Sequence, residues 1–380
     1  MALNEQQIAF RDSVRHFVRK ELPEGFARDC DANERPPLEV YAKAASLGYL
    51  GLGVPEELGG SGGDIVDLTI LLHELAKGMM SFSIMVYRSA VHGAQSLMTY
   101  GTDEQKAKYL PRIAAGDALF CLSLTEPEAG SDAANVQLRA VQDGDEFVLN
   151  GQKLYNSSAH IADYILLVAR TANPPRKHKG LSLFIVDTKT PGIDMRRIRT
   201  MGERAIGTNE VFYTDARISG DSLMGELNEG WYLLMTNLEK ERLCMAAWCT
   251  GAAQAALASA TQWAKDRVQF GKPIGSFQAI QHMLADMALD CHIGELMVYD
   301  LADRISRGEP SAAQASMTKL YCTEMYSRVA DRGLQVQGGF GYTMESDMQL
   351  HMRDARIMTI GGGSSQIMRN IIAKQLGLPA

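Results

Sequence analysis

The chain has 380 residues, of which 46% are hydrophobic and 22% charged, with a formal net charge of −7. A chain of this length is expected to fold as two or three packed subdomains. The negative balance disfavours binding to nucleic-acid phosphates, and no apolar run approaches the ~20 residues of a membrane helix. We therefore expect neither a nucleic-acid partner nor membrane insertion.

The start of the chain has neither the basic and then apolar order of a signal peptide nor the Arg-rich composition of a transit sequence. We therefore expect a cytoplasmic protein. The six cysteines form no CxxC pair, and the eight histidines show no paired ligand spacing. Buried thiols and no metal site are the expectation.

The periodicity of apolar residues changes twice along the chain. Apolar residues recur at helical spacing over residues 5–116, except in a glycine-rich stretch at 48–63. This stretch is not flanked by a strand and then a helix, as a dinucleotide-binding motif would be, so we interpret it as a loop. Strand-like runs separated by Gly, Pro and Asp occupy 119–223, and helical patterns return over 230–376. The sequence predicts an α+β fold with an N-terminal helical domain (1–117), a central β domain (118–228) and a C-terminal helical domain (229–380).

Five segments, in order and spread over nearly the whole chain, resemble motifs of the acyl-CoA dehydrogenase family: residues 100–106, 124–132, 150–153, 267–273 and 351–357. Each motif alone is weak, but the ordered combination is specific. The resemblance implies that the C-terminal domain is a four-helix bundle and that the chain forms a homotetramer with one FAD per subunit. It also implies oxidation of an acyl-CoA to the 2-enoyl-CoA, with electrons passed to an electron-transferring flavoprotein.

The resemblance further assigns residues to the FAD. At the flavin ring these are Leu122, Leu124, Thr125, Tyr155 and Ser157; beside the pyrophosphate Gly130 and Ser131; near the adenosine half Ser364 and Gln366; and, reaching the FAD of a neighbouring subunit, Arg267, Phe270, Gln335 and Gly339. Tyr155 replaces the common Trp and keeps an aromatic ring. Without the resemblance, Thr125 and Ser131 would be interpreted as turn and helix-capping residues.

The closing motif departs from the family at its catalytic position. Where the family usually has a tyrosine followed by the catalytic glutamate, this chain has Gly361 and Gly362. The reaction removes an α-proton from a thioester while hydride leaves the β-carbon for flavin N5, so a positioned base is chemically necessary. If the chain is an active dehydrogenase, its base must come from another segment.

Glu241 is the candidate for this base. At helical spacing it falls inside an apolar stripe, whereas Glu239 and Lys240 fall outside; the stripe is Leu234, Leu238, Met245, Trp248 and Ala252. Burying a carboxylate is costly unless the carboxylate is paired or its pKa is raised, and a raised pKa gives it the proton affinity that a general base needs. Residues 241–243 also resemble the helix that carries the base in long-chain and isovaleryl-type members. The alternative is that Glu241 pairs with Arg242 or Lys240 at the helix edge.

The resemblance implies further contacts with the substrate. Arg242 is expected to contact the CoA moiety, Ser131 and Gly361 to border the substrate, and the Gly362 N–H to stabilise the enolate-like oxygen. Loss of two side chains at 361 and 362 favours a bulky acyl group. Three other functions stay open: an enoyl-CoA reductase, a flavin oxidase or monooxygenase on the same fold, and a non-catalytic homologue.

Overall fold

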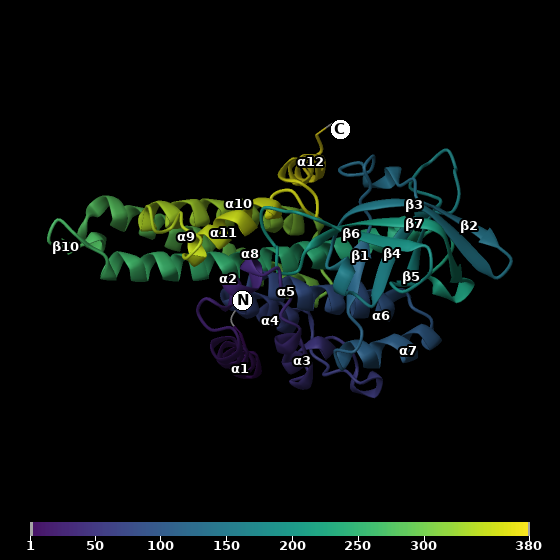
Figure 1. Cartoon of the computed structure of the whole chain (residues 1–380), viewed down its shortest axis with the longest axis horizontal. Helices are drawn as coiled ribbons and strands as arrows, with labels where there is room; N and C mark the ends of the chain where they lie inside the picture. Colours follow the sequence, from purple (N-terminus) through teal and green to yellow (C-terminus); the bar gives the residue numbers. More distant parts are fainter. Residues whose placement is uncertain (1–2, 379–380) are drawn as a thin grey trace.

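The computed structural model describes residues 3–378 and follows the predicted order of helices, strands and helices (Figure 1). The N-terminal helices are α1 (Glu5–Glu21), α2 (Phe26–Ala32), α3 (Leu38–Ser46), α4 (Ile65–Gly78), α5 (Met80–Tyr87), α6 (Ser96–Tyr100) and α7 (Asp103–Ala114). Capping boxes begin α1, α4 and α7, where Asn4, Asp64 and Thr102 each accept from the backbone N–H three residues later. These caps satisfy N–H groups that the helix itself leaves free.

Two irregular segments interrupt the N-terminal helices. The glycine-rich stretch forms a connection with two short 3₁₀ turns, η1 (Tyr49–Gly51) and η2 (Glu56–Leu58), as interpreted from the sequence. Between α5 and α6 the chain runs through a π-helical segment, η3 (Arg88–Gln95). Sequence periodicity did not indicate this segment, because a π-helix differs from an α-helix only in its wider turn.

The central domain is built around one mixed sheet. Its strands are β1 (Phe120–Ser123), β2 (Arg139–Asp143), β3 (Glu146–Ser157), β4 (Tyr164–Arg170), β5 (Leu181–Asp187), β6 (Ile193–Ile198), β7 (Thr208–Ser219) and β8 (Leu223–Met224). Their order is β6-β7-β3-β2-β4-β5-β8, and β1 pairs in parallel with β4. β4 is buried along its whole length, which explains its apolar run from Ile165 to Ala169.

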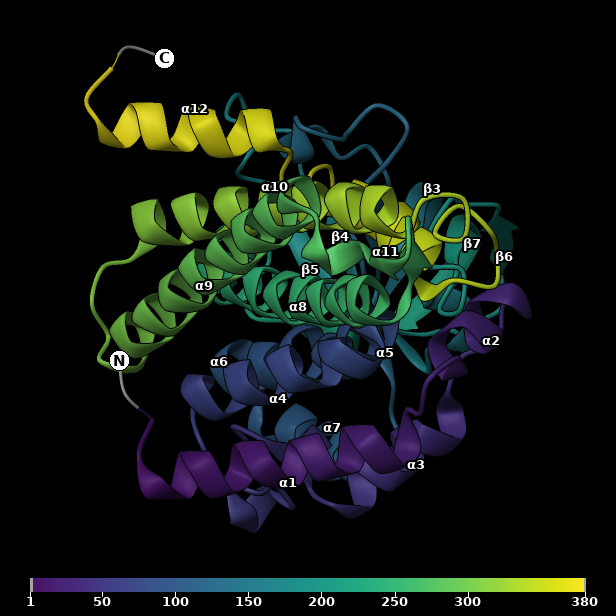
Figure 2. The same ribbon diagram turned by 90° about the vertical axis from the view of Figure 1, so that its left-hand side faces the viewer.

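The C-terminal domain consists of long helices. They are α8 (Gly230–Asp266), α9 (Gln278–Ser306), α10 (Ala312–Gln337), α11 (Asp347–Met358) and α12 (Ser365–Gln375), with a small hairpin of β9 (Val268–Gln269) and β10 (Lys272–Pro273). Figure 2 shows α1, α4, α8 and α10 in successive layers. At Gly251 of α8 an added Cβ would lie 2.1 Å from the carbonyl oxygen of His73, so only glycine allows the close approach of α8 to α4.

The central helix α8 is long and apolar enough to span a membrane by length and composition alone. In this structure 72% of its most apolar window is buried within the protein, as in the core helix of a globular domain. All six cysteines are buried and free, which confirms the expectation of buried thiols.

Candidate active site

A glycine loop, residues 359–363, follows α11 and faces α8. Gly362 has a φ of 62°, a left-handed conformation that glycine adopts without strain. A Cβ at this position would lie 2.3 Å from Sδ of Met245, which projects from α8. Glu241 precedes Met245 by one helical turn and therefore shares its face of α8. The face that carries Glu241 meets the glycine loop at Gly362.

A buried lysine of α10 holds the glycine loop. The Nζ of Lys319 donates to the carbonyl oxygen of Met358 at 3.0 Å and to that of Gly363 at 2.7 Å. The side chain is fully buried, and this burial lowers the pKa of Lys319 to about 8. The cation thus joins the two ends of the loop.

The loop also presents unused donors. Within residues 3–378, the backbone N–H groups of Gly362 and Gly363 donate no hydrogen bond, whereas those of Ile360 and Gly361 both donate to the carbonyl oxygen of Ile357. Free backbone donors are suited to an oxygen on which negative charge develops.

The carboxylate of Glu241 contacts a histidine. Its side chain is 15% exposed, and its Oε1 lies 3.6 Å from Nε2 of His92. The same nitrogen is 3.0 Å from the hydroxyl oxygen of Tyr87, and the two rings pack edge to face. Tyr87 ends α5 and His92 lies in η3. Such π-helical segments are rare and occur often at functional sites.

The charged neighbours of Glu241 along α8 point to other partners. Lys240 donates to Oε1 of Gln95 at 2.9 Å, and Arg242 donates through Nη1 to the hydroxyl of Ser316 at 3.3 Å. In the part of the chain described, the one basic side chain within 4.0 Å of the Glu241 carboxylate is that of His92. The alternative that Glu241 pairs with Lys240 or Arg242 is therefore wrong.

The side chain of Arg242, which is predicted to contact CoA, is buried in this structure. It is 7% exposed, and this burial lowers the pKa of its guanidinium. Its Nε is buried with no partner among the described residues, so it can still donate to an added acceptor. Its contact with CoA stays a prediction.

A buried ion pair fixes the turn after β1. Nζ of Lys153 donates to the carbonyl oxygen of Leu124 at 2.9 Å and to Oε1 of Glu126 at 2.8 Å. The carboxylate of Glu126 also accepts from the backbone N–H groups of Gln137 and Leu138. Burial lowers the pKa of Lys153 to about 8, although Glu126 opposes this shift. A pair so fully hydrogen-bonded holds the turn in one conformation.

The two segments that carry the residues predicted at the flavin ring lie side by side. The backbone N–H of Leu154 donates to the carbonyl oxygen of Thr125 at 2.8 Å, so the turn after β1 lies beside the end of β3. Tyr155 lies at an irregularity of β3, with a φ of 58° and 61% of its surface exposed. The other residues predicted at the ring are half-buried, namely Leu122, Leu124, Thr125 and Ser157, and the two predicted beside the pyrophosphate, Gly130 and Ser131, are exposed.

The residues predicted to reach a neighbouring subunit gather at the opposite end of the molecule. The hairpin after α8 lies at the end of the long helices that is farthest from the sheet (Figure 1). Trp263 and Phe340 stack there at 4.7 Å and join the end of α8 to the segment after α10. All four predicted residues are exposed, with Phe270 at 93%: Arg267, Phe270, Gln335 and Gly339. They are therefore not part of the flavin-ring group within one chain.

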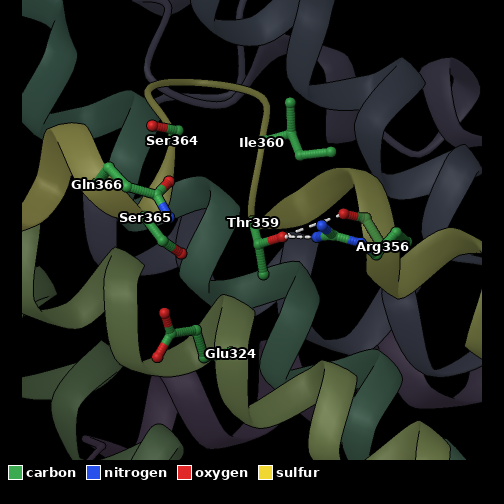
Figure 3. A pocket seen from close by; sticks show the side chains of 7 residues that line it. All are labelled: Glu324, Arg356, Thr359, Ile360, Ser364, Ser365 and Gln366. Atoms are coloured by element: carbon green, nitrogen blue, oxygen red, sulfur yellow. Dashed lines mark hydrogen bonds between the residues drawn. The ribbon is translucent and has the colours of Figure 1, made fainter.

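Ser364 and Gln366 line a cavity of about 280 Å³ at the start of α12. Figure 3 shows them on one side, with Arg356 on the other and Glu324 below. The hydroxyl of Ser364 caps α12 by accepting from the N–H of Ile367. The cavity combines a helix N-terminus with an arginine, groups that bind anions or polar ligands.

Sequence models of the acyl-CoA dehydrogenase N-terminal, middle and C-terminal domains match residues 4–117, 121–216 and 228–377. The chain belongs to the acyl-CoA dehydrogenase family. It is 36% identical to the probable acyl-CoA dehydrogenase YngJ of Bacillus subtilis, covering 98% of both chains. It is 35% identical to the caffeyl-CoA reductase-Etf complex subunit CarC of Acetobacterium woodii, covering 99% of both.

A solved acyl-CoA dehydrogenase from Geobacillus kaustophilus matches the structure with a TM-score of 0.95 and 34% identity over 99% of both chains. The predicted fold class of this acyl-CoA dehydrogenase family member is therefore confirmed.

Sequence reasoning missed two functional candidates, His92 and Lys319. Lys319 interrupts an apolar face of α10 formed with Ala315, Cys322 and Tyr326, and such an interruption is a usable signal for a buried cation. His92 has no comparable signal, because its contact with Glu241 joins segments about 150 residues apart in sequence and depends on tertiary packing.

Proposed function

We propose that this chain is an FAD-dependent acyl-CoA dehydrogenase in which Glu241 removes the α-proton of an acyl-CoA thioester. The observation that carries this proposal is the contact of α8 with the glycine loop. Met245 of α8 occupies the space that a side chain at position 362 would need, and Glu241 lies one turn before Met245 on the same face of the helix. With no carboxylate at 362, we assign the base to this face of α8, which carries Glu241.

The residues around the turn after β1 fit a flavin ring. Leu122 and Leu124 are partly buried, and Tyr155 offers an aromatic surface that the chain itself leaves exposed. We assign Thr125, Ser157, Gly130 and Ser131 to the same FAD, with Ser364 and Gln366 nearer its adenosine half. FAD, when bound, supplies the acceptor for the hydride that leaves the β-carbon.

The other steps, namely proton removal, stabilisation of the thioester oxygen and binding of the substrate, are assigned to residues of the chain itself. Glu241 takes the α-proton, and the free N–H of Gly362 donates to the thioester oxygen as negative charge develops there. Arg242 has a spare donor for the CoA portion, and Gly361 leaves room beside the acyl group because a Cβ there would meet little. This room favours branched or cyclic acyl groups.

We infer that electron-transferring flavoprotein is the redox partner and that the working form is a homotetramer. The first inference is supported by the likeness to CarC, whose name places it in a complex with Etf. The second is supported by the exposed group of Arg267, Phe270, Gln335 and Gly339, which is separated from the flavin-ring residues of its own chain.

An enoyl-CoA reductase is the second candidate, and the likeness to CarC favours it. The same groups would act in reverse, with protonated Glu241 donating to the α-carbon.

The test is anaerobic mixing of the FAD-loaded protein with straight, branched and cyclic acyl-CoAs, followed by flavin absorbance. Glu241→Gln should slow flavin reduction by about 10²–10⁴-fold. Glu239→Gln is the matched control, because Glu239 accepts from Ser311 and should leave the rate within about threefold. Wild-type rates in Glu241→Gln would refute the assignment of the base.

Three further outcomes separate the alternatives. No flavin reduction by any acyl-CoA, together with oxidation of reduced flavin by enoyl-CoAs, identifies a reductase. Rapid reoxidation of reduced flavin by oxygen identifies an oxidase or monooxygenase. Failure to bind FAD identifies a non-catalytic homologue.

A further inference from the structure

His92 is placed against Glu241 by an unusual piece of backbone. It is 6% exposed and lies in the π-helical segment η3, directly after Tyr87 ends α5. Its Nε2 faces both the Tyr87 hydroxyl, at 3.0 Å, and the Glu241 carboxylate, at 3.6 Å. An apolar side chain would fill the same space without a polar group to satisfy, so packing alone does not account for an imidazole here.

The surroundings determine which ring nitrogen carries the proton. Nδ1 of His92 is buried and has no partner among residues 3–378. A proton on Nδ1 would be a buried donor without an acceptor, which costs about 1–3 kcal/mol. A proton on Nε2 instead has an acceptor in the Tyr87 hydroxyl at 3.0 Å, and it also faces the Glu241 carboxylate at 3.6 Å, just beyond hydrogen-bond distance. The neutral ring therefore carries its proton on Nε2, with the positive end of this N–H turned toward Glu241.

Tyr87 remains a neutral partner in this arrangement. Burial raises the pKa of Tyr87 well above its usual range, and the negative charge of Glu241 raises it further. Its ring also packs edge to face on Trp248 of α8, which fixes the hydroxyl beside His92. The phenol can accept from Nε2 without becoming an anion that would compete with the carboxylate.

The other ionisable groups near Glu241 are engaged elsewhere. On α8 itself, Lys240 is bonded to Gln95 and Arg242 to Ser316 of α10, while burial keeps the Cys244 thiol protonated by raising its pKa. From α10, Lys319 is bonded to the carbonyl oxygens of the glycine loop. Within the described chain, His92 is thus the donor available to the carboxylate at this distance.

We propose that His92 is a positioning residue whose Nε2–H, 3.6 Å from the Glu241 carboxylate, orients that carboxylate and stabilises its charged form before proton transfer. This inference rests on the proposed function of Glu241. The positive end of a donor N–H beside a carboxylate favours its charged form, and we therefore expect loss of His92 to disfavour that form. This loss also frees the side chain of Glu241 to rotate away from the α-carbon.

The test uses three variants of the FAD-loaded protein. His92→Phe keeps an aromatic ring against Tyr87 and removes the donor, His92→Gln restores an N–H near the position of Nε2, and Tyr87→Phe removes the second acceptor. Anaerobic flavin reduction at saturating acyl-CoA is measured from pH 5 to 9. We expect His92→Phe to lower the rate at pH 7 by about 10–100-fold and to move the pH midpoint up by about one unit. His92→Gln should regain most of both, and Tyr87→Phe should keep the wild-type midpoint within about half a unit.

A second measurement needs no flavin. The infrared carbonyl band of protonated Glu241 is followed as a function of pH in the FAD-free protein, and the band is assigned by its absence in Glu241→Gln. The pH midpoint of this band should shift up in His92→Phe but not in His92→Gln. If His92→Phe does not fold, His92→Leu takes its place as the variant without a donor: an upward shift there with a wild-type midpoint in His92→Gln supports the proposal, and an unchanged midpoint in His92→Leu overturns it.

The failures of the two proposals are distinguishable. An unchanged rate and midpoint in His92→Phe, with Glu241→Gln inactive, overturns the role of His92 and leaves Glu241 as the base. Full activity in Glu241→Gln removes the base assignment itself, and the role of His92 falls with it.

Discussion

Two segments meet at the proposed active site, and they differ in the groups they present. Helix α8 provides a side chain, Glu241, held on a rigid element and contacted by His92. The glycine loop provides backbone only, with free N–H groups and a left-handed Gly362 whose missing Cβ leaves room for Met245. In the proposed site the carboxylate comes from a helix and the backbone donors from a loop, and the left-handed Gly362 packed against Met245 leaves no room for a second carboxylate there.

The largest expected effect comes from moving the carboxylate to the loop. The double variant Glu241→Gly with Gly362→Glu should remain about 10²–10⁴-fold slower than wild type in flavin reduction. Glutamate at 362 needs a φ of 62° and its Cβ would strike the sulfur of Met245 at 2.3 Å. Adding Met245→Ala should recover at least about tenfold, since the obstruction is removed. Wild-type rates in the double variant alone would show that the loop is not closed to a carboxylate.

A second effect concerns the anchor of the loop. Lys319→Met keeps the length of the side chain but removes the donor to the carbonyl oxygens of Met358 and Gly363. Each lost bond costs about 1–3 kcal/mol, partly offset because a buried charge is also removed. We expect amide hydrogen exchange in residues 359–365 to accelerate by about tenfold or more, with exchange in α8 unchanged. Lys240→Met is the control on the helix side, and equal acceleration in both variants would argue against a specific anchor.

The smallest effect concerns acids that are buried but do no chemistry. Asp354 of α11 accepts from the backbone N–H of Glu203 at 2.7 Å, and burial raises the pKa of Asp354 to about 8 and that of Glu203 to about 7. The folded state keeps these protons while the unfolded chain releases them near pH 4, so this stabilisation is complete below pH 4 and is lost as pH rises to about 8. Asp354→Asn should therefore raise the Tm at pH 9 by about 2–4 °C and change it little at pH 5. An equal change at both pH values would contradict this linkage.

The two segments also differ in how far the sequence could predict them. Glu241 could be found because it interrupts an apolar stripe and because residues 241–243 resemble a known helix. The stripe did not predict burial, however, since Glu239, Lys240 and Glu241 are all partly buried in the structure. From Arg242 to Ala253 the helix is buried on all sides, so periodicity carries no further information there.

Other parts of the site depend on contacts between distant segments. The domain order followed from apolar periodicity, which is a local property. The contact of His92 with Glu241 and the anchoring of the glycine loop by Lys319 arise only when the helices pack, and the π-helical turn at η3 has no local signature. Local pattern thus predicts elements and single candidates, whereas the partners that tune them need tertiary structure.

The most direct test of the account is exchange of the α-hydrogen with solvent. The FAD-loaded protein is incubated in D₂O with an acyl-CoA analogue that cannot lose a β-hydride, and deuterium at the α-carbon is followed by NMR. We expect steady exchange with wild-type protein and exchange at least about 10²-fold slower with Glu241→Gln. Wild-type exchange in Glu241→Gln would contradict the claim that this carboxylate is the base.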